Sequence, residues 1–270
     1  MGLDIYAGTL TRYYSNNWKT NVQRFCEDNG IEFSQVDGNG VELKEREQSP
    51  EEICEIVSEW RDRIIDMIEQ QKKRSPSLFN IFRKKKITNL TWEENNTKDY
   101  YTDKPDWDAY GALLLFTASI IYHEEIPKTL PSHWDFESNP LIQRIKKDEK
   151  VVGWSLFRET MMWLPINEGF SFRDTAPDGN EIIISTSGNL LSELYDLNAN
   201  SWNADEDTIL NWRKTEGYDA NEEIVDAKDN ALIIHDDVSN TESLAKFAFS
   251  IMYSAAKYSL KNRVPIVFDY

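Results

Sequence analysis

The sequence predicts an α+β fold in which a small mixed sheet, built with both chain ends, packs against several helices. At the start of the chain, Leu3, Ile5 and Ala7 alternate with more polar residues, which is the period of a strand. Residues 264–270 combine apolar residues with Asp269 and a tyrosine in a similar way. Between the ends, helical and strand-like segments are mixed without strict alternation, which is typical of α+β proteins. Because chain termini often lie close together, we expect the two terminal strands to be neighbours.

A helix is expected directly after Tyr14, with Ser15 or Asn16 as its cap and Gly30 at its end. Apolar residues recur in it at helical spacing. Residues 31–36 then resemble a short strand closed by the turn sequence DGNG.

A long amphipathic helix begins at Ser49. The sequence SPEE combines a serine cap, a proline at the first helical position and Glu52, three residues after the serine, which is a capping box. The apolar stripe behind it consists of Ile53, Val57, Trp60, Ile64 and Ile68.

Residues 72–106 differ from the rest of the chain. They begin with a basic cluster and continue into a polar segment rich in turn-forming residues. We expect a surface excursion here. Its basic cluster is either solvated or docked on the acidic face of the protein, or it binds phosphate or an acidic surface.

Residues 106–125 are apolar nearly all round, which predicts a buried central helix. A shorter helix is expected over residues 138–150 and a buried strand over residues 180–186. Two short helices over 187–197 and 205–215, a strand over 230–237 and a helix over 240–262 complete the elements that the pattern predicts. Residues 151–172 are dense in aromatics and match no single template.

Length and composition indicate one domain over residues 1–270, because no segment resembles a linker and hydrophobic content is 40%. The formal net charge of -17 argues against a nucleic-acid or anionic-membrane binder, which needs a surplus of lysine and arginine. It suits a soluble protein, and also one that captures a basic partner. No signal peptide and no apolar run long enough to span a bilayer are visible, so a cytoplasmic location is expected.

The candidate catalytic residues are Asp4, Arg12, His123 and Glu124. His123 follows the buried helix and has two acidic neighbours, so it could serve as the base of a pocket. A histidine at a helix end also suits the dipole there. The three histidines, His123, His133 and His235, match no metal-ligand spacing, and we predict neither a metal site nor a cofactor.

The segment Ser185–Asn189 joins a predicted strand to a predicted helix and carries Ser187 within it. Free N–H groups at such a junction can bind an anion. Ser187 or Asn189 could instead simply cap the helix.

A belt of aromatic and arginine residues is the third candidate. Trp, Tyr and Arg are enriched in interface hot spots, and the same residues also suit a core. The binding candidates from this belt are Trp154, Arg158, Trp163 and Arg173.

The segments MGLDIYAG, WLPINEGFSF and VPIVFDY resemble those of uncharacterised bacterial proteins, a resemblance that implies no activity. In composition the chain also resembles the acidic, tryptophan-rich immunity proteins of bacterial toxin systems. Two functions are therefore expected as alternatives. The first is an immunity-like module that binds a basic protein. The second is a small-molecule-binding protein or hydrolytic enzyme with a pocket around His123 and the Ser185–Asn189 junction.

Overall fold

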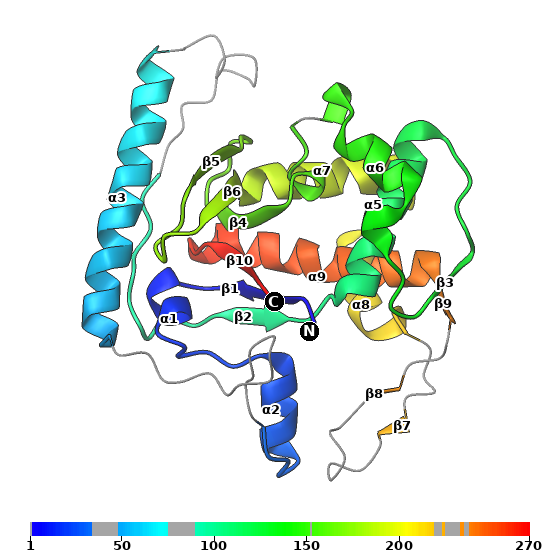
Figure 1. The fold of residues 1–270 in the computed structure, drawn as a ribbon, viewed down its shortest axis with the longest axis horizontal. Helices are drawn as coiled ribbons and strands as arrows, with labels where there is room; N and C mark the ends of the chain where they lie inside the picture. The colour runs from blue at the N-terminus through cyan, green and yellow to red at the C-terminus, as the bar shows by residue number, and fades with distance from the viewer. Residues whose placement is uncertain are drawn as a thin grey trace.

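The computed structural model has the α+β fold that the sequence predicts, with helices on both faces of a six-stranded mixed sheet (Figure 1). The residues that the structure describes are 2–33, 48–74, 90–151, 153–218, 223–224, 233–234 and 238–270.

The sheet has the strand order β2-β1-β10-β4-β6-β5. The β4–β6 pair is parallel and every other pair in this sheet is antiparallel. The strands are β1 (Asp4–Ala7), β2 (Tyr101–Asp103), β4 (Thr160–Leu164), β5 (Phe172–Thr175), β6 (Glu181–Thr186) and β10 (Ile266–Asp269).

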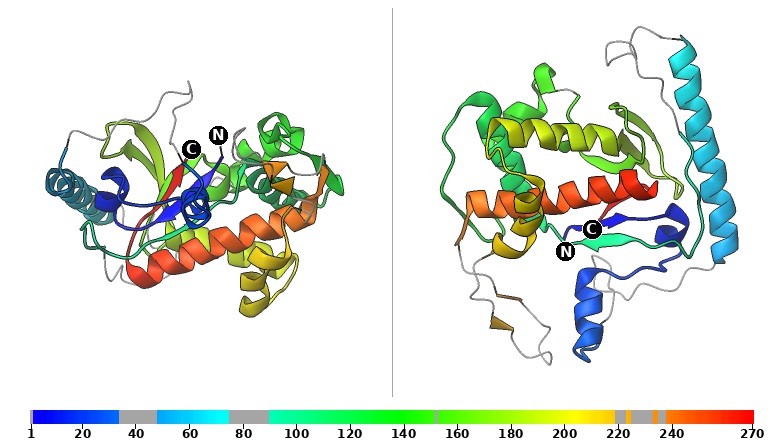
Figure 2. Two further views of the ribbon diagram at one scale, coloured as in Figure 1. Left: turned by 90° about the horizontal axis from the view of Figure 1, so that it is seen from below. Right: turned by 180° about the vertical axis from the view of Figure 1, so that it is seen from behind.

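The two terminal strands pair with each other, as expected. β1 runs antiparallel to β10, with Asp4 opposite Asp269 and Ala7 opposite Ile266. Both ends of the chain therefore lie side by side within the sheet, not at its edge (Figures 1 and 2).

Helices and smaller strands surround this sheet. The α-helices are α1 (Leu10–Tyr14), α2 (Asn21–Asp28), α3 (Pro50–Arg74), α5 (Trp107–Tyr122), α6 (Pro140–Lys146), α7 (Ser187–Asn200), α8 (Glu206–Thr215) and α9 (Thr241–Asn262). The short 3-10 helices are η1 (Phe136–Ser138), η2 (Glu149–Val151) and η3 (Ser155–Phe157). Two small ribbons pair β3 (Thr129–Pro131) with β9 (Val238–Asn240), and β7 (Glu223–Ile224) with β8 (Ile233–Ile234).

Strand residues alternate between two hydrophobic cores, one on each face of the sheet. In β1, Ile5 and Ala7 belong to the core with α5, α7 and α9, while Tyr6 belongs to the core with α1 and α3. In β10, Phe268 and Val267 divide in the same way. The period of two therefore determines which face each side chain covers. Figure 2 shows α7 and α9 crossing one face of the sheet.

The predicted capping box and apolar stripe of α3 are confirmed. The Ser49 hydroxyl accepts from the backbone N–H of Glu52, and the Glu52 carboxylate accepts from the Ser49 N–H at 2.8 Å. All five residues of the predicted stripe are buried. Trp60 also donates its indole N–H to the Thr175 carbonyl at 2.7 Å, which fixes α3 to β5.

The predicted helix after Tyr14 is wrong in its start. Thr9 caps a short α1 that includes Tyr14, and Thr20 caps the separate α2. The hydroxyls of Thr9, six residues before Ser15, and of Thr20, four residues after Asn16, satisfy the free N–H groups, so Ser15 and Asn16 lie between the two helices. The predicted strand over 31–36 lies mostly outside the described residues.

The predicted surface excursion is wrong for residues 90–106. Leu90 and Trp92 are buried against α1 and α3, and β2 pairs with β1 at the edge of the sheet. Large apolar side chains within a polar segment bring it onto the core. The remainder of the excursion, up to residue 89, lies outside the described residues apart from the last turn of α3.

The other predicted elements from residue 106 onward are present. The central helix is α5, whose residues 112–115 are buried on every side. Of the predicted strand over 230–237, the structure describes only β8, and His235 lies outside the described residues. No helix in the described part of the chain is both long enough and apolar enough to cross a membrane.

Candidate functional site

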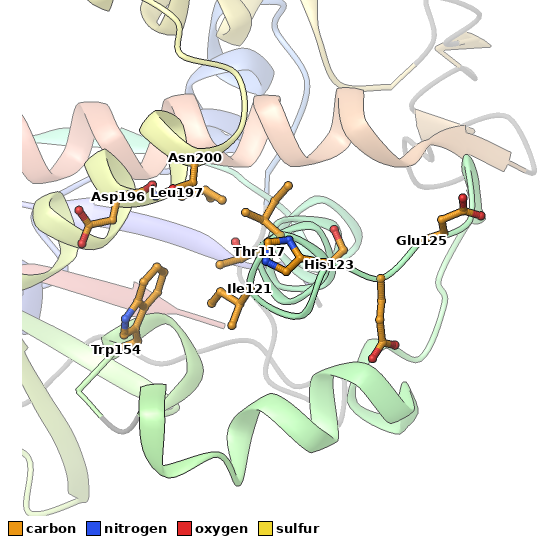
Figure 3. Close-up of a pocket in the computed structure, with 11 residues that line it drawn as sticks. Thr117, Ile121, His123, Glu125, Trp154, Asp196, Leu197 and Asn200 are labelled. Carbon is orange, nitrogen blue, oxygen red and sulfur yellow. Dashed lines mark hydrogen bonds between the residues drawn. The ribbon is translucent and has the colours of Figure 1, made fainter.

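A cavity of about 570 Å³ lies between the end of α5 and the end of α7 (Figure 3). It brings together three of the predicted site residues, His123, Glu124 and Trp154. Figure 3 shows Trp154 and Asp196 on one side of the cavity and His123 with Ile121 on the other. The lining residues are Thr117, Ser119, Ile120, Ile121, His123, Glu124, Glu125, Trp154, Asp196, Leu197 and Asn200.

His123 ends α5 in the left-handed conformation, with φ of 55°. The N–H of Glu124 then donates to the Ser119 carbonyl at 3.1 Å. This tight helix end places the imidazole beside the cavity. His123 therefore has the helix-end position that the sequence suggested as the alternative to a pocket base.

Three neutral polar side chains of the cavity use a donor within their own helices. The hydroxyls of Thr117 and Ser119 each donate to a carbonyl in the preceding turn at 2.7 Å, and the Asn200 amide nitrogen donates to the Asp196 carbonyl at 2.7 Å. Their oxygen lone pairs and the second N–H of the Asn200 amide remain for a ligand. These three residues therefore offer mainly acceptors.

Three acidic side chains surround the cavity in different ways. Glu124 forms an ion pair with Arg144, whose guanidinium also stacks on Tyr122 at 3.8 Å from the ring centroid. Glu125 lies at the rim and points outward in Figure 3. Neither Glu125 nor Asp196 has an ion-pair partner among the residues that the structure describes.

The other two catalytic candidates, Asp4 and Arg12, do not share this cavity. Asp4 faces Asp269 across the β1–β10 pair. Burial raises the pKa of the Asp4 carboxyl to about 6, Lys104 opposes the rise, and Asp269 adds to it. Arg12 donates to the carbonyls of Asn17 and Lys98. The opening aspartate is thus part of the sheet.

Asp269 has its own partner on this side of the sheet. The Tyr13 hydroxyl donates to the Asp269 carboxylate at 2.6 Å. The Arg12 guanidinium lies 4.5 Å from the ring centroid of Tyr100. Tyr6 packs against the rings of both Tyr13 and Tyr100. These contacts tie α1 to the last strand and to the segment before β2.

The Ser185–Asn189 junction is a closed structural joint and not an open anion site. Thr186, not Ser187 or Asn189, is the N-cap of α7 and accepts from the Asn189 N–H. Ser185 and Ser187 are fully buried. The loop after β4 covers the start of α7, since the Gly188 N–H donates to the Ile166 carbonyl at 2.9 Å.

The four binding candidates of the aromatic and arginine belt separate in space. Trp163 lies in the core, and its indole N–H donates to the Ser155 hydroxyl at 3.0 Å. Arg173 is exposed on β5, and Arg158 is half-buried after η3. Of the four, Trp154 alone lines the cavity. Trp154 and Arg158 flank η3, Trp163 lies in β4 and Arg173 in β5, so closeness in sequence does not make a common surface here.

Sequence reasoning missed Glu193, a buried carboxylate in α7. It accepts from the N–H groups of Ser155 and Leu156, from the Ser155 hydroxyl and from the Asn189 amide. Burial raises the pKa of Glu193 to about 8, and the hydrogen bonds from Ser155 oppose the rise. The available signal was its place among Leu190, Leu194 and Leu197, on the buried side of the helix.

Sequence reasoning also missed a ridge of carboxylates on α3. The acidic ridge consists of Glu52, Glu55, Glu59, Asp62, Asp66 and Glu69, all exposed. Their spacing alternates between three and four residues, which aligns them along one side of a helix. The ridge extends for about 26 Å, at 1.5 Å per residue.

Among the described residues, no group of three or more His, Cys, Asp or Glu side chains is placed to hold a metal ion. No family model, curated protein or solved structure matches this chain. The interpretation of function therefore depends on the geometry of the cavity and of the acidic ridge.

Proposed function

We propose that this protein binds a basic protein partner through the acidic ridge of α3. The carrying observation is the unbroken row of exposed carboxylates along one side of a helix that packs on the sheet through its other side. Immunity proteins, which the composition resembles, would belong to this class of acidic proteins that bind a basic partner.

The ridge is poorly neutralised by its own surroundings. Asp62 pairs with Arg61 at 2.8 Å. The neighbouring Arg63 turns instead to Asp174 on β5, also at 2.8 Å. Among the described residues, no other ridge carboxylate forms a salt bridge, so most of the negative charge faces solvent and supports attraction of a cationic surface.

The ridge also lowers the stability of its own helix. Like charges three or four residues apart destabilise a helix by about 0.2–0.5 kcal/mol for each pair. Neighbouring members of the ridge form five such pairs, which amounts to about 1–2.5 kcal/mol. Apart from Glu52, whose carboxylate belongs to the capping box, the ridge residues lie off the buried side of α3 that packs on the core, so their charges favour a role outside the fold.

The ridge is held rigidly, which supports binding with little loss of entropy. Besides the Trp60 contact to β5, Arg61 donates to the Trp92 carbonyl at 2.9 Å. The helix is therefore fastened on two sides, to β5 and to the segment before β2. A partner with lysine or arginine side chains about 5 Å apart along a 26 Å surface would match it.

Capture from a lysate of the encoding organism tests the proposal. The ridge variant Glu55→Lys, Glu59→Lys, Asp66→Lys is compared with a control variant, Asp28→Lys, Glu181→Lys, Asp207→Lys. Both sets replace three exposed acidic residues, so net charge changes equally. We expect wild type and control to retain a basic protein at about 0.05 M salt and to release it at about 0.5 M. The ridge variant should not retain it.

Two results would contradict the proposal. One is capture of the same basic protein by the ridge variant and the control alike. The other is the absence of any salt-sensitive basic protein on the wild-type resin, when circular dichroism confirms that all three proteins are folded.

A further inference from the structure

We propose that the cavity between α5 and α7 binds a small organic cation, an alkylammonium or alkylguanidinium with an apolar chain. This proposal goes beyond the basic-partner function, because α5 and the end of α7, which line the cavity, lie across the molecule from α3 (Figure 1). The ligand class follows from four properties of the lining: its size, its apolar body, its hydrogen-bonding character and its charge.

The size and apolar body of the cavity suit a small molecule. Its volume of about 570 Å³ lies within the usual range of ligand pockets. Ile120, Ile121 and Leu197 provide the apolar walls, together with the half-buried indole of Trp154. An alkyl chain placed here would remove apolar surface from water on both partners.

The hydrogen-bonding character favours a ligand that is rich in donors. Thr117 and Ser119 donate their hydroxyl hydrogens to the backbone, Asn200 donates one of its two, and all three present oxygen lone pairs. An ammonium or guanidinium has three to five N–H donors and no acceptor. For a carboxylate or phosphate the described lining offers only the side-chain N–H groups of His123, Trp154 and Asn200, and it includes no lysine or arginine.

The charge of the cavity points in the same direction. The last turns of two helices, ending at Tyr122 and Asn200, line it, and a helix C-terminus carries partial negative charge. Asp196 adds a full charge without an ion-pair partner among the described residues. It lies on the same side as the Trp154 indole, whose face attracts cations (Figure 3).

The cation that pairs with a lining residue does not fill this role. Arg144 lies on Tyr122 and pairs with Glu124, and it is not itself among the described residues that line the cavity. Its pairing neutralises Glu124, so Asp196 is the carboxylate that we assign to the ligand. Glu125 points outward and would contribute only at a distance.

Calorimetric titration with four probes of matched chain length tests the ligand class. The probes are butylammonium, agmatine, which carries a guanidinium and an ammonium at the two ends of its four-carbon chain, 1-butanol and butyrate. We expect the two cations to bind with dissociation constants of about 1 mM or tighter, and the alcohol and the carboxylate to give no saturable heat. Equal binding of butanol or butyrate, or no binding of either cation, would overturn the proposal.

Two variants and a control place the binding in this cavity. Asp196→Asn and Trp154→Leu are each expected to weaken agmatine binding about tenfold, since each removes a contact to the charged group. Asp66→Asn, which makes the same change on α3, should leave binding unchanged. An unchanged affinity in Asp196→Asn would overturn the assignment. Urea unfolding of each variant checks that it remains folded.

A spectroscopic readout reports on the location directly. The indole N–H signal that disappears in Trp154→Phe identifies Trp154 in a proton–nitrogen correlation spectrum. Agmatine is expected to shift this signal, and a shift confined to other indoles contradicts the site. A blocked arginine peptide that shifts the same signal at lower concentration than agmatine would assign the cavity to an arginine side chain of a partner, and would overturn the small-molecule proposal.

Discussion

At the scale of single residues, the structure holds two carboxyl groups in opposite ways: one oxygen of the half-buried Asp4 lacks a hydrogen-bond donor among the described residues, and the buried Glu193 is surrounded by donors. Asp4 faces another aspartate, and its oxygen Oδ1 is buried with no hydrogen-bond partner in the structure. Glu193 has donors on both of its oxygens. Removing the charge of Asp4 and removing the acceptor oxygens of Glu193 should therefore change stability in opposite directions.

Asp4→Asn is expected to stabilise the protein above pH 6. The pKa of Asp4 is raised from 3.8 unfolded to about 6 folded, so the folded state binds more protons between these values. The contribution of Asp4 to stability is thus lost as pH rises through 6. At pH 7.5 the variant should gain about 1–3 kcal/mol in unfolding free energy. Urea unfolding at pH 4.5 and 7.5 measures this, with Asp66→Asn as the exposed control.

A variant that is less stable than wild type at pH 7.5 would contradict this account of Asp4. So would an unchanged difference between the two pH values. In either case the ionised Asp4 carboxylate would have to be stabilised by a charged partner such as Lys104.

Glu193→Ala is expected to destabilise the protein by about 1–3 kcal/mol. Removing the carboxyl leaves the buried N–H groups of Ser155 and Leu156 without their acceptor, whichever protonation state Glu193 has. Asp207→Ala on the exposed side of α8 serves as the control. A urea midpoint equal to that of wild type would indicate that η3 is held by other contacts.

At the scale of secondary-structure elements, the joint between β6 and α7 is closed by a glycine. A Cβ built on Gly188 would lie 2.0 Å from the Asn167 carbonyl oxygen, which is backbone and does not move aside as a side chain would. The loop after β4 thus rests directly on the start of α7. Close approach of two backbone segments, and not an anion site, accounts for the small residue in this junction.

Gly188→Ala is therefore expected to destabilise the protein by more than 2 kcal/mol, about the range of an overpacked core position. Gly153→Ala is the matched control, because a Cβ there meets no atom within 4 Å. Thermal or urea unfolding of the two variants measures the difference. Similar stabilities for both would mean that the joint can open at little cost in free energy.

At the scale of the whole molecule, net charge opposes folding. The chain carries a formal charge of -17, and its exposed acidic ridge concentrates part of that charge on one helix. Self-repulsion of this kind destabilises a compact state and is screened by salt. Stability should therefore depend on ionic strength more than in a neutral protein.

The unfolding temperature is expected to rise by a few degrees between about 0.02 and 0.5 M sodium chloride. A variant with Glu55→Gln, Glu59→Gln and Asp66→Asn should start from a higher temperature and rise less, because part of the repulsion is already removed. Differential scanning calorimetry measures both. A fall in the unfolding temperature with salt would indicate that attractive ion pairs dominate instead.

Several elements, among them β1, α3 and α5, follow from local patterns that are readable in the sequence. Alternation in residues 3–7 predicted a strand, and the capping box at Ser49 predicted where α3 begins. The apolar run of α5 predicted a buried helix. Each of these signals depends on neighbours within a few residues, so a single sequence contains it.

Only the tertiary structure decided which distant residues meet. His123, Trp154 and Asp196 come from different segments, and nothing in their local patterns places them around one cavity. Likewise Asp4 meets Asp269 only because β1 and β10 pair in one particular register. The sequence by itself determined most of the helices, the terminal strands and the strongly negative charge, because these depend on composition and local order, whereas β2 and β4 had no such local signal. The cavity and the two cores depend on long-range packing, which local periodicity does not encode.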